Sequence, residues 1–203
     1  PLSGLKVIEM AGLGPVPLAA LILSEMGATV VRVARLGAAA SFLNLPPELD
    51  LDRQGRGTVK VDLKAPEGMA LMRELAAGAD VLIEGFRPGV MERLGLGPDD
   101  LDETVIFGRI TGWGQDGPLS PRPAYDHVIQ GMCGIMLTTG KQGDGPTKVG
   151  APYIDSVKLG ERMNKFGLAG AAFRPVSFKP MFQKHAHAIC RGLQVHVTDR
   201  DAF

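Results

Sequence analysis

A strand, a helix and a second strand follow one another near the start of the chain, and this succession constrains the fold more than any other feature. The apolar run at 5–10 stops at a turn rich in Gly and Pro. An amphipathic stretch at 17–26 then predicts a helix that Gly27 ends, and a second apolar run covers 28–33. Two strands joined by one helix within about 30 residues lie parallel, with a right-handed crossover.

The same alternation continues along the chain, with strands predicted at 59–63, 80–84 and 105–110 and helices at 66–77, 90–94 and 124–136. The second strand shows little polar alternation, which is typical of a strand covered on both faces. We therefore predict an α/β fold with a Rossmann-like, doubly wound and mostly parallel sheet. Ligands of such sheets bind outside the carboxyl ends of the strands.

The character of the chain changes near residue 157. Phenylalanine becomes frequent beyond this point, and only 193–198 alternates cleanly as a strand. We predict two parts, a domain at 1–157 and an unrelated tail at 158–203 with short, irregular α+β structure.

Charge and composition exclude several classes of function. The 22 basic and 22 acidic residues of the 203-residue chain balance, so there is no electrostatic reason to expect nucleic acid as a partner. Two cysteines argue against a disulfide framework. No apolar run approaches the ~20 residues that span a bilayer, and the first residues lack a signal-peptide pattern. We expect a soluble, cytoplasmic protein that does not bind a membrane.

Three familiar ligand-binding patterns fail on spacing. The turn Gly12-Leu-Gly14 is followed by Pro17, where a dinucleotide fingerprint needs its third glycine. The segment from Gly134 to Lys141 has one residue too many between its glycines for a phosphate-binding P-loop. The histidines and cysteine of the tail fit no zinc spacing, so we predict no metal site.

A carboxylate and several arginines remain as candidates for chemistry. Asp155 ends the apolar stretch 149–154, where desolvation suits a nucleophile or a base; the alternative is a helix N-cap. Clustered arginines suit phosphate groups, although each alone also fits an exposed surface position. The arginines that follow strands or open loops are Arg35, Arg56, Arg87 and Arg93. His127 fits a partly exposed structural histidine.

Several blocks of the chain resemble CoA-transferase family III, which includes formyl-CoA and carnitine CoA-transferases and α-methylacyl-CoA racemase. The blocks are LSGLKVIEMAGLGPVPLAALILSEMGATVVRV near the start, GRGTVKVDLKAPEG at 55–68, DVLIEGFRPGVMERLGLGPDDL at 80–101, TGWGQDGP at 111–118, RPAYDHVIQGMCG at 122–134 and VGAPYIDS at 149–156. The block at 80–101 is the most specific of them.

The resemblance implies a CoA-binding domain and a covalent reaction. In this family an aspartate forms an acyl anhydride and then an aspartyl-CoA thioester, and Asp155 matches that aspartate. Arg35 and Arg93 match positions that hold the nucleotide end of CoA, and Phe86 matches a residue that lines the same site. CoA or acyl-CoA is then a substrate rather than a permanently bound cofactor. A carboxylic acid is the second substrate, and family members are homodimers.

Two short segments decide between the transferase and racemase activities of the family. The Gly14-Pro15 turn is closer to α-methylacyl-CoA racemase, because transferases similar to the formyl-CoA enzyme carry glutamine there. The racemase places a catalytic histidine in a Gly-His-Asp triplet, and Tyr125 stands at that position here, as in many transferases. We therefore predict transfer of CoA between carboxylic acids, with 2-methylacyl-CoA epimerisation and non-catalytic CoA binding as alternatives. Gly14, Pro15 and Tyr125 join the predicted CoA site.

The tail resembles a different family. The stretches FRPVSF at 173–178 and GLQVHVTDR at 192–200 are similar to a short piece of exo-β-N-acetylmuramidases. A piece of this length should not form an active site, so the resemblance implies no catalytic residue in the tail.

Overall fold

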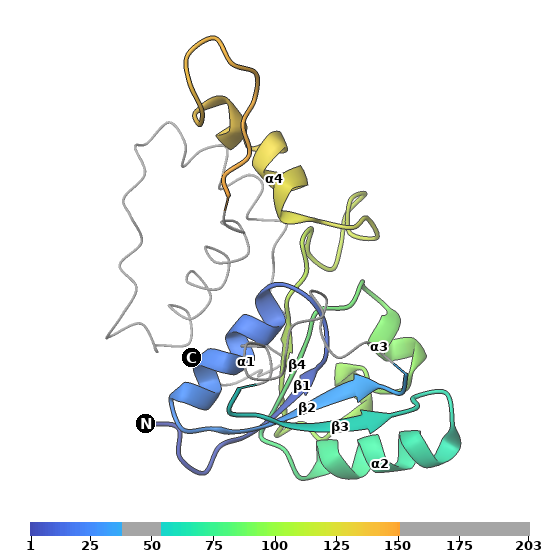
Figure 1. Cartoon of the computed structure of the whole chain (residues 1–203). Helices are drawn as coiled ribbons and strands as arrows, with labels where there is room; N and C mark the ends of the chain where they lie inside the picture. The colour runs from blue at the N-terminus through green and yellow to red at the C-terminus, as the bar shows by residue number, and fades with distance from the viewer. Residues whose placement is uncertain (38–53, 151–203) are drawn as a thin grey trace. The chain divides into compact units, whose positions relative to one another are not determined.

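The computed structural model describes residues 1–37 and 54–150 of the chain (Figure 1). The described residues divide into two compact units after Ile110. The predicted boundary near 157, the tail strand at 193–198 and Asp155 lie outside the described residues. Within the described part of the chain, no helix has the length and apolar character needed to cross a membrane.

The first unit is built on a five-stranded sheet with order β3-β2-β1-β4-β5 and parallel pairing throughout. This is the order of the first five strands of the doubly wound dinucleotide-binding sheet. The predicted α/β class with a parallel sheet is therefore confirmed. The strands are β1 (Lys6–Met10), β2 (Thr29–Arg35), β3 (Gly57–Val61), β4 (Val81–Glu84) and β5 (Ile106–Arg109).

Helices cover both faces of this sheet, and Figure 1 shows α1 (Pro15–Glu25) and α2 (Pro66–Ala77) on opposite sides of it. Successive residues of a strand point to opposite faces, and β1 shows the consequence. Ile8 and Met10 join a core cluster with Met72 of α2 and with α3 (Val90–Arg93). The opposite face is covered by α1, which packs on β1, β2 and β4.

Helices α1 and α4 (Asp126–Met132) differ most from the prediction. The first helix begins at Pro15 rather than Pro17, because proline fits the first helical position, where its missing N–H is not needed. The helix predicted at 124–136 is wrong in length, since α4 covers only Asp126–Met132. Gly134 then takes a left-handed conformation with φ 73°, which ends the helix before the 3₁₀ turn η4 (Ile135–Leu137).

The second unit has its own small core around α4. Trp113 and Ile129 are buried there, and the partly buried Cys133 packs against them. A Cβ on Gly112 would lie 1.7 Å from the Cβ of Ala124, so only glycine fits where the two segments cross.

Candidate functional site

Three of the predicted site residues lie at the carboxyl edge of the sheet. Gly14 follows β1, Arg35 ends β2 and Phe86 follows β4, and these three strands are neighbours. The chain leaves β1 through α1 on one face and leaves β4 through α3 on the other. Ligands of open α/β sheets bind at such a switch point, so the edge between β1 and β4 is the candidate site.

The turn after β1 is shaped by glycine and proline. Gly14 has φ 79° and ψ −126°, a conformation that side chains other than glycine rarely adopt. Pro15 and Pro17 in the first turn of α1 carry no N–H, so this helix start offers fewer donors to a phosphate than an ordinary helix start. This supports the rejection of a dinucleotide fingerprint here.

The start of α1 packs closely against the end of β4. A Cβ on Gly85 would lie 2.8 Å from Cγ2 of Val16, which is shorter than an ordinary van der Waals contact. In dinucleotide-binding folds the third glycine of the fingerprint permits this close approach of helix and sheet. Here Gly85, directly after the neighbouring strand β4, permits it.

The turn from β4 to α3 brings two predicted CoA residues onto one short segment. Phe86 is half-buried and packs against the core cluster. Gly89 caps α3 with φ 78°, and a Cβ there would lie 3.0 Å from Nη1 of Arg93. The exposed guanidinium of Arg93 therefore folds back over the end of this turn.

Sequence reasoning missed a chain of charged side chains beneath this turn. Oε2 of Glu84 accepts a hydrogen bond from the backbone N–H of Phe86 at 2.6 Å, and Oε1 lies 3.3 Å from Nε of Arg109. Nη2 of Arg109 in turn donates to Glu92 on α3. The guanidinium also lies over the ring of Phe107, 5.1 Å from its centroid. We call Glu84, Arg109 and Glu92 the carboxyl-edge triad.

Burial controls the electrostatics of this triad. Burial raises the pKa of Glu84 to about 7, although the Phe86 N–H and the charge of Arg109 oppose the rise. Burial is the largest influence on the pKa of Glu92 and acts upward, but the hydrogen bonds to its carboxylate and the charges of Arg109 and Arg93 together outweigh it, so that pKa lies below its ordinary value. The signal that sequence reasoning overlooked is the charged residue at the end of the apolar strands β4 and β5, which must find a partner when buried.

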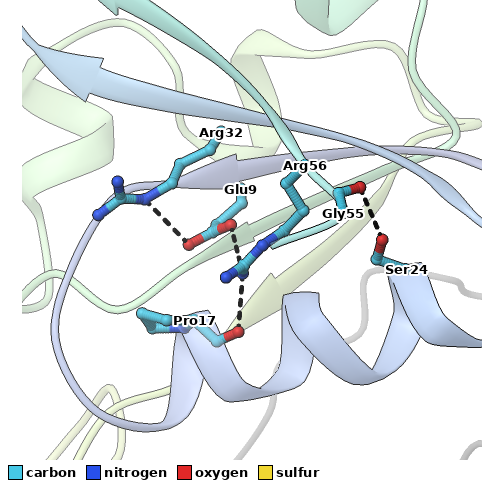
Figure 2. A network of polar contacts seen from close by, with 6 residues as sticks. All are labelled: Glu9, Pro17, Ser24, Arg32, Gly55 and Arg56. Carbon is cyan, nitrogen blue, oxygen red and sulfur yellow. Dashed lines mark hydrogen bonds and ion pairs between the residues drawn. The ribbon is translucent and has the colours of Figure 1, made fainter. Parts of the chain in front are cut away.

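A second buried network lies between the sheet and α1 (Figure 2). Nη1 of Arg56 donates to Oε2 of Glu9 at 2.9 Å and to the carbonyl oxygen of Pro17 at 2.8 Å. Nε of Arg32 lies 3.6 Å from Oε1 of Glu9. The Arg56 side chain is fully buried, so the expectation of a ligand-binding or exposed arginine is wrong at this position. Its contacts tie the start of β3 to β1 and α1.

Tyr125 belongs to the second unit. It precedes α4, is 60% exposed, and stacks on the ring of His127 at 5.9 Å between centroids. Asp126 accepts a hydrogen bond from the buried Gln130, whose Oε1 accepts the N–H of Val149 at 3.0 Å. The start of the segment that leads to Asp155 is thus attached to α4.

Comparison with known proteins adds the family context. Residues 2–159 match the family model of CoA-transferase family III, and residues 137–203 match that of the C-terminal part of the exo-beta-N-acetylmuramidase NamZ. Human alpha-methylacyl-CoA racemase is 38% identical over 150 residues, which are 71% of this chain and 37% of the racemase. Human succinyl-CoA:glutarate CoA-transferase is 34% identical over 167 residues, covering 76% of this chain and 38% of the relative.

Bacterial proteins match a larger share of this chain. A probable fatty acyl-CoA transferase of Mycobacterium tuberculosis is 37% identical over 183 residues, with 84% of this chain and 45% of the relative covered. A crystal structure of a CAIB/BAIF family protein from Brucella suis has a TM-score of 0.72 at 28% identity, covering 94% of this chain and 50% of that one. The chain thus spans less than half the length of these three curated relatives.

Proposed function

Because this chain belongs to CoA-transferase family III, we propose that it is the CoA-binding part of an enzyme that moves CoA between carboxylic acids. The observation that carries the proposal is the meeting of Gly14, Arg35 and the Phe86–Arg93 turn at one edge of a parallel sheet. The relatives named as CoA-transferases support this choice of reaction.

We propose that the carboxyl edge holds the nucleotide end of CoA. Arg35 and Arg93 are exposed there, and a guanidinium donates two parallel hydrogen bonds to a phosphate. The half-buried ring of Phe86 gives an apolar surface beside them. The Gly14-Pro15 turn lets the ligand approach the backbone closely, because Gly14 has no side chain.

Asp155 is the proposed nucleophile. Its carboxylate attacks the thioester carbonyl of acyl-CoA, the C–S bond breaks, and a mixed anhydride and CoA thiolate form. The thiolate then attacks the aspartyl carbonyl, which releases the first carboxylate and leaves an aspartyl-CoA thioester. The acceptor carboxylate reverses these steps and leaves with CoA, so Asp155 returns unchanged.

Epimerisation of a 2-methylacyl-CoA is the second candidate, favoured by the identity to the racemase. Tyr125 argues against it, because it stands where the racemase resemblance requires a histidine. His127 does not stand at that position, since it lies two residues further along the chain, where its ring stacks on that of Tyr125. The two reactions also differ in product, since epimerisation exchanges the α-proton and transfer does not.

We propose that the family III part ends near residue 157 and that the tail adds no active site of its own. A homodimer, which the resemblance implies, would be the assembly in which the reaction takes place. A chain that binds CoA without turnover is the non-catalytic alternative.

Calorimetric titration of the purified chain with CoA tests the binding site. Changing Arg93 to Gln should weaken CoA binding about tenfold, because one charge-assisted contact to phosphate is lost. Lys6→Gln is the matched control, since it removes the same charge at the amino end of β1, the opposite edge of the sheet. Equal weakening in both variants would refute a specific site at the carboxyl edge.

Mass spectrometry after incubation with acyl-CoA tests the reaction. A CoA adduct on the wild-type chain that is missing in Asp155→Asn supports transfer. Deuterium entering the α-position of the acyl group from heavy water, without an adduct, supports epimerisation instead. Saturable binding with neither result identifies a non-catalytic CoA-binding chain.

A further inference from the structure

The carboxyl-edge triad joins three elements of the first unit. Glu84 ends β4, Arg109 ends β5 and Glu92 lies in α3. The side chains of Glu84 and Arg109 are only 3% and 8% exposed, and that of Glu92 is 43% exposed. The contacts therefore run from the buried end of the sheet out to the helix that follows the turn.

Burying the charged side chains of Glu84 and Arg109 costs desolvation free energy. An ion pair taken out of water gains little stability over apolar side chains of the same volume, because desolvation offsets the attraction between the charges. Stability alone therefore does not explain why charged groups occupy the ends of β4 and β5. Directional contacts do explain it, since a carboxylate and a guanidinium fix the angles and distances of the groups they bind.

Both residues proposed to contact CoA on the β4–α3 turn depend on the triad. The backbone N–H of Phe86, the second residue after β4, donates to Glu84, so the start of the turn is held by the triad. Arg93 directly follows Glu92, which Arg109 holds. Helix α3 has only four residues, too few to hold its shape without tertiary contacts.

We propose that Glu84, Arg109 and Glu92 are positioning residues that hold the β4–α3 turn in its ligand-binding shape and thereby set the affinity for CoA. The proposal rests on the proposed function for its ligand. It assigns no contact with CoA to the triad itself, whose role is to place Phe86 and Arg93.

Positioning and simple electrostatics predict opposite signs for one substitution. CoA carries several negative charges, so removing a carboxylate near its site should strengthen binding if only the electric field matters. If Glu92 acts through Arg109 to hold α3, Glu92→Gln should weaken binding although the site becomes less negative, because a neutral amide oxygen holds the charged guanidinium less strongly than a carboxylate does. Glu74→Gln is the matched control, because Glu74 is an exposed glutamate of α2 and the same charge is removed.

The test combines two measurements on the whole chain. Hydrogen–deuterium exchange without ligand reports the order of residues 86–93, and calorimetry reports the dissociation constant for CoA. We expect Glu92→Gln to speed exchange in this segment and to raise the dissociation constant, each by roughly three- to tenfold. Glu74→Gln should change neither, and the melting temperatures of the two variants should agree within about 3 °C.

Glu84 offers a conservative rescue. Glu84→Gln keeps an amide oxygen that can accept the Phe86 N–H, and should bind CoA within about threefold of the wild type. Glu84→Leu has no acceptor and should lose at least about tenfold in affinity. Equal affinity in these two variants would overturn the positioning role of Glu84.

The outcomes separate this proposal from the proposed function. Unchanged exchange in Glu92→Gln overturns the positioning role whether or not CoA binds. Faster exchange with unchanged or tighter CoA binding overturns the link between the turn and affinity. A wild-type chain that does not bind CoA overturns the proposed function and the ligand part of this inference together, while the exchange data still decide whether the triad orders the turn.

Discussion

Replacing Arg56 with methionine tests how much the buried network of Figure 2 contributes to stability. Methionine keeps most of the side-chain length and removes the guanidinium, so the carboxylate of Glu9 stays fully buried with Arg32 at 3.6 Å beside it. Breaking a buried ion pair by removing one partner costs about 3–5 kcal/mol. Because Arg32 still compensates part of the charge, we expect the free energy of unfolding to fall by about 3 kcal/mol.

A double-mutant cycle with Glu9→Leu isolates the coupling between the two side chains. Glu9→Leu alone leaves the Arg56 guanidinium buried and should also cost about 3 kcal/mol. The double variant replaces the pair by apolar side chains, so its cost should be well below the sum of the single costs, with a coupling of about 2–3 kcal/mol.

Urea unfolding followed by circular dichroism at pH 7 gives the four free energies of this cycle. Single costs below about 1 kcal/mol would mean that Arg56 is hydrated in solution. Costs that simply add in the double variant would mean that the two groups are stabilised separately. Either result would refute the reasoning.

The other predictions concern Glu84, Gly85 and Asp155. Since burial raises the folded-state pKa of Glu84 from 4.5 to about 7, its contribution to stability is full below pH 4.5 and is lost as the pH rises through 7. Between pH 4 and pH 8 the free energy of unfolding of the wild type should therefore fall by up to about 3 kcal/mol more than that of Glu84→Gln, measured by urea unfolding at both pH values. Parallel pH profiles of the two proteins would contradict the shift. Gly85→Ala should lower the free energy of unfolding by about 1–3 kcal/mol in the same assay, because its Cβ would lie 2.8 Å from Val16. Gly57→Ala is the control, since its Cβ meets nothing within 4 Å and should not destabilise the protein. Similar effects of the two substitutions would argue against close packing of α1. Asp155→Asn should keep CoA affinity within about twofold while abolishing the covalent adduct seen by mass spectrometry, and an adduct in this variant would assign the nucleophile to another residue.

Local patterns were sufficient to predict the elements of the sheet unit. Helix α2 covers the predicted 66–77, because Pro66 marks its first residue and the apolar positions Met69 and Met72 repeat at helical spacing. The order of strands and helices followed from short apolar runs that alternate with amphipathic ones. That order placed the Gly-rich turn at Gly14 and Arg35 at the carboxyl edge of the sheet, and the family resemblance added Phe86; all three follow or end neighbouring strands there.

What the sequence did not predict depends on contacts between distant segments. Arg56 meets Glu9 across 47 residues, and no local spacing distinguishes an arginine that will be buried from one that stays exposed. The triad has the same character, since Arg109 reaches back 17 residues to Glu92. Local competition explains the short α4, because a left-handed conformation is available to Gly134 and ends the helix where the apolar pattern continues.

The central position of β1 has a consequence during synthesis of the chain. β1 pairs with β2 on one side and with β4 on the other, and the bond from the Lys6 N–H to Asp80 spans 74 residues. Until β4 leaves the ribosome, β1 is an open edge with apolar side chains and two charged groups, Lys6 and Glu9. A chain that stalls on the ribosome between β3 and β4 would thus expose an unpaired β1 edge to pairing with its own copies.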